Sequence, residues 1–141
     1  MPSSHDHPLS AELRVAVQRL SRRLRQEKAD DELSDSQSSV LAYLLRSGAR
    51  TPAELSAFEH VTPPSMNRTL NALQTAGYVV RTPDEADGRK VIVTLTGAGR
   101  DFVVETRRRR DEWLEQGLAT LSPAELALLA QAAPIIRKLT E

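Results

Sequence analysis

Signals that start and stop helices recur at short intervals after residue 33, and they limit this part of the chain to a series of short helices. Ser34 with Gln37, and Thr51 with Glu54, have the spacing of capping boxes, in which each side chain satisfies a free backbone N–H of the other. Gly48 is placed to end the first of these helices. The spacing therefore predicts one helix that stops at Gly48 and a second, short one that begins after Thr51.

A further short helix opens at Pro63 or Pro64, since a proline disfavours helix in the residue before it, and it ends at Gly77. Two strands follow at residues 79–82 and 91–95, and in the second strand the apolar residues alternate. Two adjacent helices with a tight connection and an antiparallel hairpin behind them form a winged helix-turn-helix. The predicted fold class is mainly α with one small hairpin.

Longer helices are predicted at both ends of the chain. The first carries apolar residues on one stripe and ends near Ala29; the stripe consists of Leu9, Leu13, Val17, Leu20 and Leu24. Thr96 is a plausible cap for a helix from about residue 98 to 119, and Ser122 with Glu125 begins the last one. Pro134 lies inside this last helix and predicts a kink or a break. Residues 1–8 are expected to be frayed.

Composition excludes several classes of function. Lys and Arg total 19, as do Asp and Glu, so any polyanionic partner must be recognised by a local patch rather than by net charge. Cysteine is absent, which removes disulfides, thiolate metal sites and thiol switches. His5, His7 and His60 lack metal-ligand spacing, so we expect neither a metal nor a cofactor. No nucleophile motif or phosphate loop suggests an enzyme, and no apolar run suggests a membrane span or a signal peptide, so a cytoplasmic location is expected.

The helix that begins at Pro63 or Pro64 has two different faces. Met66, Leu70 and Leu73 share the face predicted to be buried. The opposite side carries Pro64, Arg68, Asn71 and Thr75, with Ser65 and Asn67 at its edges. Arg, Asn, Ser and Thr are side chains that bind base edges in a major groove, and the face is slender enough to enter one. The alternative is an ordinary solvated helix face.

The segment RTPDEADGRKVIV at residues 81–93 extends a hairpin whose tip buries nothing. Arg89 and Lys90 lie at this tip, and Asp87 is close enough to hydrogen-bond Arg89 and aim it across the turn. Asp84 and Glu85 would repel phosphate, which favours one aimed cation over a general basic patch. A single guanidinium on a narrow projection suits a narrow minor groove. The alternative is a charged hairpin turn without a partner.

The segment VTPPSMNRTLNALQTAGYVVRTPDEADGRKVIVTLTGAG resembles the recognition helix and wing of the MarR family of bacterial transcriptional regulators. The flanking helices match that family in order and length. The resemblance implies a homodimer that binds the successive major grooves of a pseudo-palindromic DNA operator. It divides the chain into residues 1–33 and 97–141 for dimerisation and residues 34–96 for DNA binding. The implied function is a sequence-specific regulator, a repressor.

Carried over by position, the resemblance places Arg89 in the minor groove with Asp87 as its brace, and it points Pro64, Ser65, Asn67 and Arg68 at DNA. Asn71 and Lys90 complete the predicted DNA-binding set. Ala86 departs from the family, which often has Arg or another polar residue at this point of the tip.

The family also implies that a small ligand, often aromatic or phenolic, binds between the dimerisation helices and the winged lobe. Two alternatives to a regulator stay open: a winged-helix module for protein contacts without a ligand response, and a small enzyme. Four arginines at residues 107–110 suggest a solvated, salt-bridged helix, with contact to the DNA backbone as the alternative. Trp113 suggests a core or dimer position rather than a ligand box.

Overall fold

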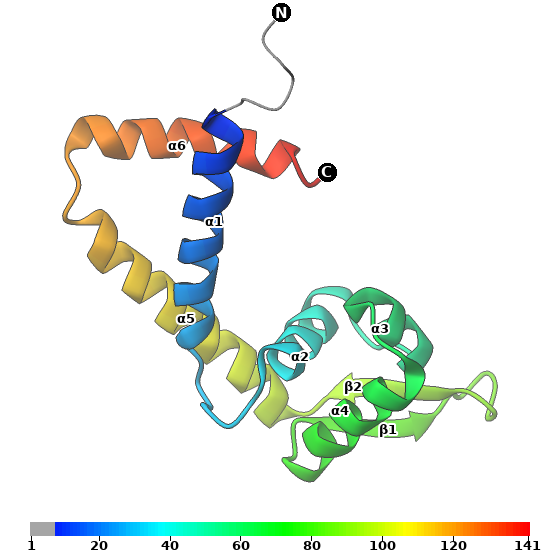
Figure 1. Cartoon of the computed structure of the whole chain (residues 1–141). Helices are drawn as coiled ribbons and strands as arrows, with labels where there is room; N and C mark the ends of the chain where they lie inside the picture. Colours follow the sequence, from blue (N-terminus) through cyan, green and yellow to red (C-terminus); the bar gives the residue numbers. More distant parts are fainter. Residues whose placement is uncertain (1–7) are drawn as a thin grey trace, which may run out of the picture.

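The computed structural model describes residues 8–141, and it contains six helices and one antiparallel hairpin (Figure 1). The elements in chain order are α1 (Pro8–Gln26), α2 (Asp35–Ser47), α3 (Pro52–Glu59), α4 (Pro63–Thr75), β1 (Val79–Pro83), β2 (Val91–Leu95), α5 (Gly97–Leu118) and α6 (Pro123–Lys138). The predicted fold class, a mainly helical winged helix-turn-helix with helices on both sides, is confirmed. We call α2, α3, α4 and the hairpin the lobe, and we call the hairpin itself the wing.

The predicted caps are all present, which explains why sequence located the helix starts well. Ser34, Thr51 and Ser122 each form a complete capping box with the residue three positions later. Thr96 caps α5 by accepting a hydrogen bond of 3.1 Å from the backbone N–H of Gly99. These are contacts within one turn of chain, so local sequence alone determines them.

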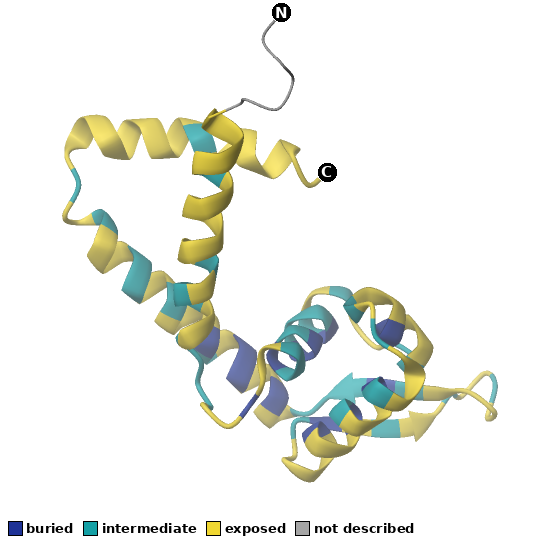
Figure 2. Cartoon of the chain, in the orientation of Figure 1, coloured by how far each residue is buried: buried dark blue, intermediate teal, exposed yellow. Residues whose placement is uncertain are grey.

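A single hydrophobic core fills the lobe. Its fully buried side chains come from every element of the lobe: Val40, Leu41, Leu55, Met66, Leu70, Leu73, Val79 and Val93. Phe102 and Val103 from the start of α5 join the same core. Figure 2 shows the buried residues gathered in the lobe and in the adjoining end of α5. The lobe and the beginning of α5 therefore form one packed unit.

The rest of the molecule is an arm of helices, made of α1, α6 and the later turns of α5 (Figure 1). Neither α1 nor α6 contains a buried residue. The predicted apolar stripe of α1 is thus largely open to solvent within the single chain. One contact between α1 and α5 places the Arg23 guanidinium 4.6 Å from the centre of the Trp113 ring. Among residues 8–141, no helix is both long enough and apolar enough to cross a membrane.

Two expectations about prolines need correction. Pro134 does not break α6, which continues from Pro123 to Lys138. Proline removes one hydrogen bond, to the carbonyl of Ala130, and because α6 is exposed water can satisfy that carbonyl. A kink within the continuous helix stays a prediction. The expectation of fraying is wrong at Pro8, which begins α1 where a proline is well tolerated; residues 1–7 lie outside the described part.

Candidate nucleic-acid interface

Helices α3 and α4 are joined by the three residues His60, Val61 and Thr62. His60 adopts the left-handed conformation with φ 55°, which turns the chain sharply at the end of α3. The hydroxyl of Thr62 then accepts a hydrogen bond from the backbone N–H of Ser65 and caps α4. This short turn holds α4 across the lobe with one long side facing solvent.

The predicted division of α4 into two faces is confirmed. Met66, Leu70 and Leu73 have no exposed surface, whereas Pro64, Asn67, Arg68, Asn71 and Thr75 are exposed and Ser65 is half-buried. Asn71 differs from its neighbours, because its side-chain oxygen accepts a hydrogen bond of 2.6 Å from Arg81 in the wing. The face therefore offers small and polar side chains without bulk that would keep it from the floor of a groove.

The wing is held rigidly at its base. Strands β1 and β2 pair from Val79 with Leu95 to Pro83 with Val91. Arg50, between α2 and α3, adds a third partner, since its backbone N–H and C=O both bond to Val93. At the other end, Asp84 N–H donates to the carbonyl of Lys90. The tip beyond this bond projects away from the lobe (Figure 1).

Arg89 lies at this tip with 96% of its side chain exposed. Its backbone N–H donates to Asp87 Oδ1 at 3.1 Å, while its Nε lies 3.6 Å from the same oxygen. The second distance is that of an ion pair rather than a hydrogen bond. Asp87 thus fixes the backbone of Arg89 and keeps its guanidinium nearby, which modifies the expected hydrogen bond to the side chain. Lys90 is exposed beside it.

Arg81 is a polar residue of this surface that sequence reasoning missed. Its Nε donates to Gln74 Oε1 at 2.8 Å and its Nη2 donates to Asn71 Oδ1, so it joins β1 to two successive turns of α4. It also lines a hollow of about 290 Å³ between α4 and the wing, together with Pro52, Asn67, Thr82, Pro83 and Val91. The signal in the sequence was the i, i+3 spacing of Asn71 and Gln74, which puts two carboxamides on one flank of the helix.

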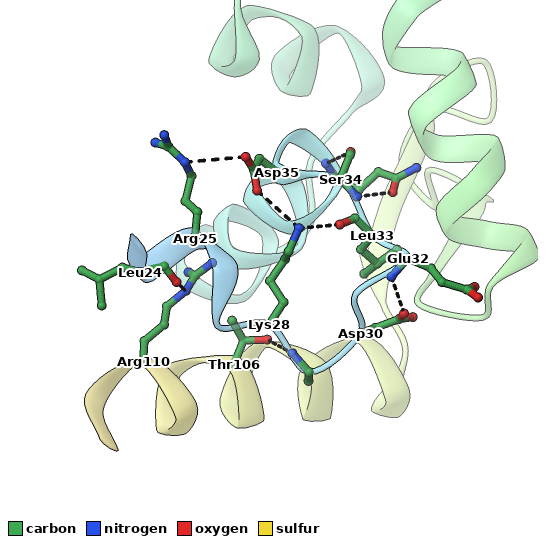
Figure 3. Close-up of polar contacts among 12 residues, drawn as sticks. Leu24, Arg25, Lys28, Asp30, Glu32, Leu33, Ser34, Asp35, Thr106 and Arg110 are labelled. Atoms are coloured by element: carbon green, nitrogen blue, oxygen red, sulfur yellow. Dashed lines mark hydrogen bonds and ion pairs between the residues drawn. The ribbon is translucent and has the colours of Figure 1, made fainter. Parts of the chain in front are cut away.

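A polar hinge connects the lobe to the arm (Figure 3). In the connection between α1 and α2, Lys28 Nζ donates to the carbonyl of Leu33 at 2.7 Å and lies 3.4 Å from Asp35 Oδ1. The backbone N–H of Ala29 donates to Thr106 Oγ1 on α5 at 3.1 Å. The connection is therefore hydrogen-bonded both to the lobe and to α5.

A small crevice of about 50 Å³ lies beside this hinge, between α2 and α5, and a hollow of about 250 Å³ adjoins it. Ser38 and Arg110 line both. Ser38 Oγ is buried without a hydrogen-bond partner among the described residues, and such a group is costly unless something satisfies it. Arg110 donates to the carbonyl of Leu24 at 3.0 Å. Partial burial lowers the pKa of its guanidinium, and nearby Asp35 offsets only part of this effect.

The other arginines of residues 107–110 differ in their surroundings. Arg108 pairs with Glu105 and Glu112, and Arg109 pairs with Glu105 and also donates to the carbonyl of Lys28. The expectation of a salt-bridged helix therefore holds for these two residues. The hydrogen bonds to the backbone of the hinge were not foreseen, because they join residues about 80 positions apart.

Comparisons of the sequence and of the structure with known proteins identify the family of this chain. A sequence profile described as MarR family matches residues 32–90. An HTH-type transcriptional regulator of Mycobacterium tuberculosis is 41% identical over 96% of this chain and 95% of its own length. A crystal structure from Pseudomonas aeruginosa superposes with a TM-score of 0.87 at 36% identity and covers 99% of both chains. BpsR of Bordetella bronchiseptica, solved to explain regulation of its DNA binding by 6-hydroxynicotinic acid, gives a TM-score of 0.67 at 26% identity over 100% of this chain and 99% of its own. With the exposed α4 face and its adjacent wing, these likenesses establish that the chain belongs to the MarR family of helix-turn-helix transcriptional regulators.

Proposed function

We propose that two copies of this chain bind one pseudo-palindromic operator and repress transcription there. In each copy α4 enters a major groove, with Pro64, Ser65, Asn67 and Arg68 toward the bases. Arg89 enters the neighbouring minor groove, braced by Asp87, while Lys90 approaches the backbone. The lobe at residues 34–96 supplies the DNA contacts, and residues 1–33 and 97–141 join the two copies.

One observation carries this proposal: an exposed guanidinium stands at the tip of a rigid projection beside an exposed polar helix face. A narrow minor groove concentrates negative potential and attracts such a cation. A cation that serves intrachain stability is packed or hydrogen-bonded, whereas the Arg89 side chain makes a single ion pair among the described residues and is 96% exposed. The arrangement favours an external anion as its partner.

The proposed dimer follows from the apolar surface of the arm. The large exposed hydrophobic residues of α1 and α6 and the cap of α6 are Leu9, Val15, Val17, Leu20, Leu126, Leu128, Leu129, Ile135, Ile136 and Leu139. So many large apolar side chains exposed on two helices are uncommon on a monomer and indicate an interaction site. A second copy supplies an equivalent surface, and the first and last two helices of each copy interlock.

The proposed regulation uses the crevice between α2 and α5. The crevice of about 50 Å³ is smaller than an aromatic ring, so only an acidic or phenolic oxygen of the ligand enters it and the ring lies in the adjoining hollow of about 250 Å³. Ser38 Oγ, which lacks a partner among the described residues, and the Arg110 guanidinium are available to bind that oxygen. The regulation of BpsR by 6-hydroxynicotinic acid supports this ligand class. The ligand must favour a spacing of the two α4 helices that does not match DNA. A 100-fold loss of operator affinity requires about 2.7 kcal/mol of differential binding.

The proposed minor-groove contact of Arg89 is tested by titrating the operator duplex with the Arg89→Ala variant. The duplex is taken from the region upstream of the protein's own gene, where footprinting first locates the site. We expect weaker binding by Arg89→Ala with unchanged fold and oligomeric mass, since the Arg89 side chain is 96% exposed. Arg108→Ala is the matched control, because its guanidinium is neutralised by two carboxylates. Equal isotherms for Arg89→Ala and wild type would contradict the proposed role of the wing.

Salt dependence separates a regulator from a protein-contact module. Binding through several phosphates must fall steeply as salt rises, because each neutralised phosphate releases counterions. Sedimentation of the free protein at several concentrations tests the dimer in parallel. Binding to duplex DNA that barely changes with salt, or a monomer at all concentrations, would contradict the proposal.

The ligand response is tested with a panel of small aromatic carboxylates and phenols. We expect at least one member to lower operator affinity for the wild type and to lose this effect in Ser38→Ala or Arg110→Gln. Ser36→Ala, on the same helix but outside the residues that line the crevice and the hollow, is the matched control for Ser38→Ala. If active compounds act equally on all four proteins, the crevice is not the effector site.

A further inference from the structure

Arg81 lies between α4 and the tip of the wing, which are the two parts of the proposed DNA-binding surface. It lies on β1 two residues after the buried Val79, so its side chain projects from the same face of the strand as Val79, toward α4. There it donates to Gln74 and Asn71 at 2.8 and 2.6 Å. The guanidinium is therefore fixed in one orientation at the junction of helix and wing.

The partners of Arg81 are both neutral. Within residues 8–141, Arg81 forms no ion pair with a carboxylate, in contrast to Arg89, Arg108 and Arg109. A guanidinium only donates hydrogen bonds, so both carboxamides must turn their oxygens toward it. The result is a positive charge that is held in place but not cancelled.

The hydrogen bonds of Arg81 also leave one nitrogen unused. Nε and Nη2 are engaged, whereas Nη1 has no partner among the described residues. Arg81 lines the hollow of about 290 Å³ between α4 and the wing, where Asn67 and Thr82 add further polar groups. The hollow is also lined by Pro52, Pro83 and Val91, so Arg81 supplies its positive charge. An oriented guanidinium with free donors beside an open hollow is suited to bind a phosphate.

We propose that Arg81 binds a backbone phosphate of the operator in this hollow, and that Asn71 and Gln74 are positioning residues that orient its guanidinium. The inference rests on the proposed DNA-binding function. The DNA strand that separates a major groove occupied by α4 from a minor groove occupied by Arg89 has to pass between helix and wing. Asn71 thereby acts through Arg81, in place of the direct adenine contact that sequence alone suggests.

The first test measures operator affinity against salt for wild type, Arg81→Gln and Arg81→Lys. Arg81→Gln removes one phosphate contact from each protomer, so the salt slope of a dimer should fall in magnitude by roughly 1.8 and affinity by at least about tenfold. The loss should be nearly uniform over a set of operator variants, since a phosphate contact carries no sequence information. Arg81→Lys should recover most of the salt slope but only part of the affinity, because it cannot span both carboxamides.

The matched control is Arg108→Gln, which removes the same charge from a site already neutralised by Glu105 and Glu112. Its salt slope should equal that of the wild type. Thermal unfolding of each variant accompanies the binding data. If Arg81 merely ties the wing to α4, Arg81→Gln lowers the melting temperature and leaves the salt slope unchanged, and that result would overturn the assignment.

A double-mutant cycle tests the role of Asn71. Asn71→Ala alone should weaken binding about threefold with little change in salt slope, because the guanidinium stays but loses its fixed orientation. In the Arg81→Gln background the same substitution should cost nothing more. Additive losses, or a changed preference at a single base pair, would show that Asn71 contacts a base directly and would refute its positioning role.

Failure of the inference is distinguishable from failure of the proposed function. A wild-type protein that binds no duplex with a steep salt dependence contradicts the regulator itself. If the operator affinity of the wild type falls steeply with salt and Arg81→Gln has the same salt slope, only the proposed phosphate site is contradicted.

Discussion

The lobe and the arm contain helices of similar length but are stabilised in different ways. Helix α4 has 13 residues and buries three large side chains completely, whereas α6 has 16 residues and buries none. Both begin with a side-chain cap, and both carry apolar residues at helical spacing. The lobe is thus packed within one chain, while the arm presents an apolar face that stays uncovered among residues 8–141.

The difference shows that an amphipathic pattern predicts that a face will be covered without specifying what covers it. The apolar residues of α4 contact other elements of the same lobe. Those of α1 and α6 contact little within the chain, although their pattern is equally helical. Substitutions in the two regions should therefore differ in how they depend on protein concentration.

The largest effect is expected from Leu70→Ala in the lobe. Leu70 is completely buried, and removing its side chain leaves a cavity that costs about 2–5 kcal/mol of unfolding free energy. Urea unfolding followed by circular dichroism measures the change. The loss should be the same at all protein concentrations, because only intrachain contacts are removed.

Leu129→Ala on α6 is the matched substitution in the arm, where 47% of the side chain is exposed in the single chain. Its cost should depend on protein concentration, since it weakens association rather than the core. A cost equal to that of Leu70→Ala and independent of concentration would mean that the arm packs within one chain.

A smaller loss is expected from Gly99→Ala at the junction of lobe and arm. A Cβ at Gly99 would overlap the backbone carbonyl oxygen of Tyr78, which already accepts a hydrogen bond from Thr96 N–H. Backbone cannot move aside cheaply, so we expect a loss of about 1–3 kcal/mol in unfolding free energy. Gly117→Ala, later in the same helix, meets nothing within 4 Å and should be neutral or stabilising by up to about 1 kcal/mol. Equal effects of the two changes would contradict this close approach.

The capping boxes of α2 and α6 sharpen the comparison further. Ser34→Ala and Ser122→Ala each remove the one hydrogen bond that the serine hydroxyl accepts from the backbone N–H three residues later, a loss of about 1 kcal/mol. In α2 the loss should appear in the global unfolding transition. In α6 it should appear as faster amide hydrogen exchange in that helix alone when the protein is dilute. Indistinguishable exchange patterns would show that the arm is as cooperative as the lobe.

The smallest effect concerns Glu105 on the exposed side of α5. Hydrogen bonds from Arg108 and then Arg109 lower the pKa of Glu105 to about 2 from its ordinary 4.5. A carboxyl whose pKa is depressed by folding stabilises the fold above the unfolded pKa, and this contribution is lost as the pH falls from about 4.5 toward 2. The effect is small because solvent screens the group. NMR titration of Glu105 measures its pKa. In Glu105→Gln the contribution of this residue to the pH dependence of the unfolding free energy should be absent.

Sequence predicted well those features that depend on neighbours within one turn or one strand. The cap residues, the inward face of α4 and the two strands were all located from such spacing. The contacts of Arg81, Arg109 and Arg110 were not, because each joins elements whose approach depends on the whole fold. Pro134 shows the opposite case: a local rule predicted a kink or a break, and the exposed helix continues without a break.

Most of the predicted DNA-facing residues share one property that local sequence does define, which is exposure on α4 or at the hairpin tip; Ser65 and Asp87 are half-buried. Asn71 shows where that reasoning stops. Its place on the helix was predicted correctly, yet its oxygen is engaged by a residue ten positions later. Hydrogen-bond partners of long side chains depend on which elements meet, and periodicity carries no information about this.

Helix α5 belongs to both regions, and its stiffness has a mechanical consequence. Its 22 residues extend about 33 Å at 1.5 Å per residue, with the first turns inside the core and later turns against α1. A rod of that length tilted by about 5° moves its far end by about 3 Å, close to the spacing of successive nucleotides. A tilt of α5 by that small angle relative to the lobe would therefore displace the arm by a distance comparable to one step along the double helix.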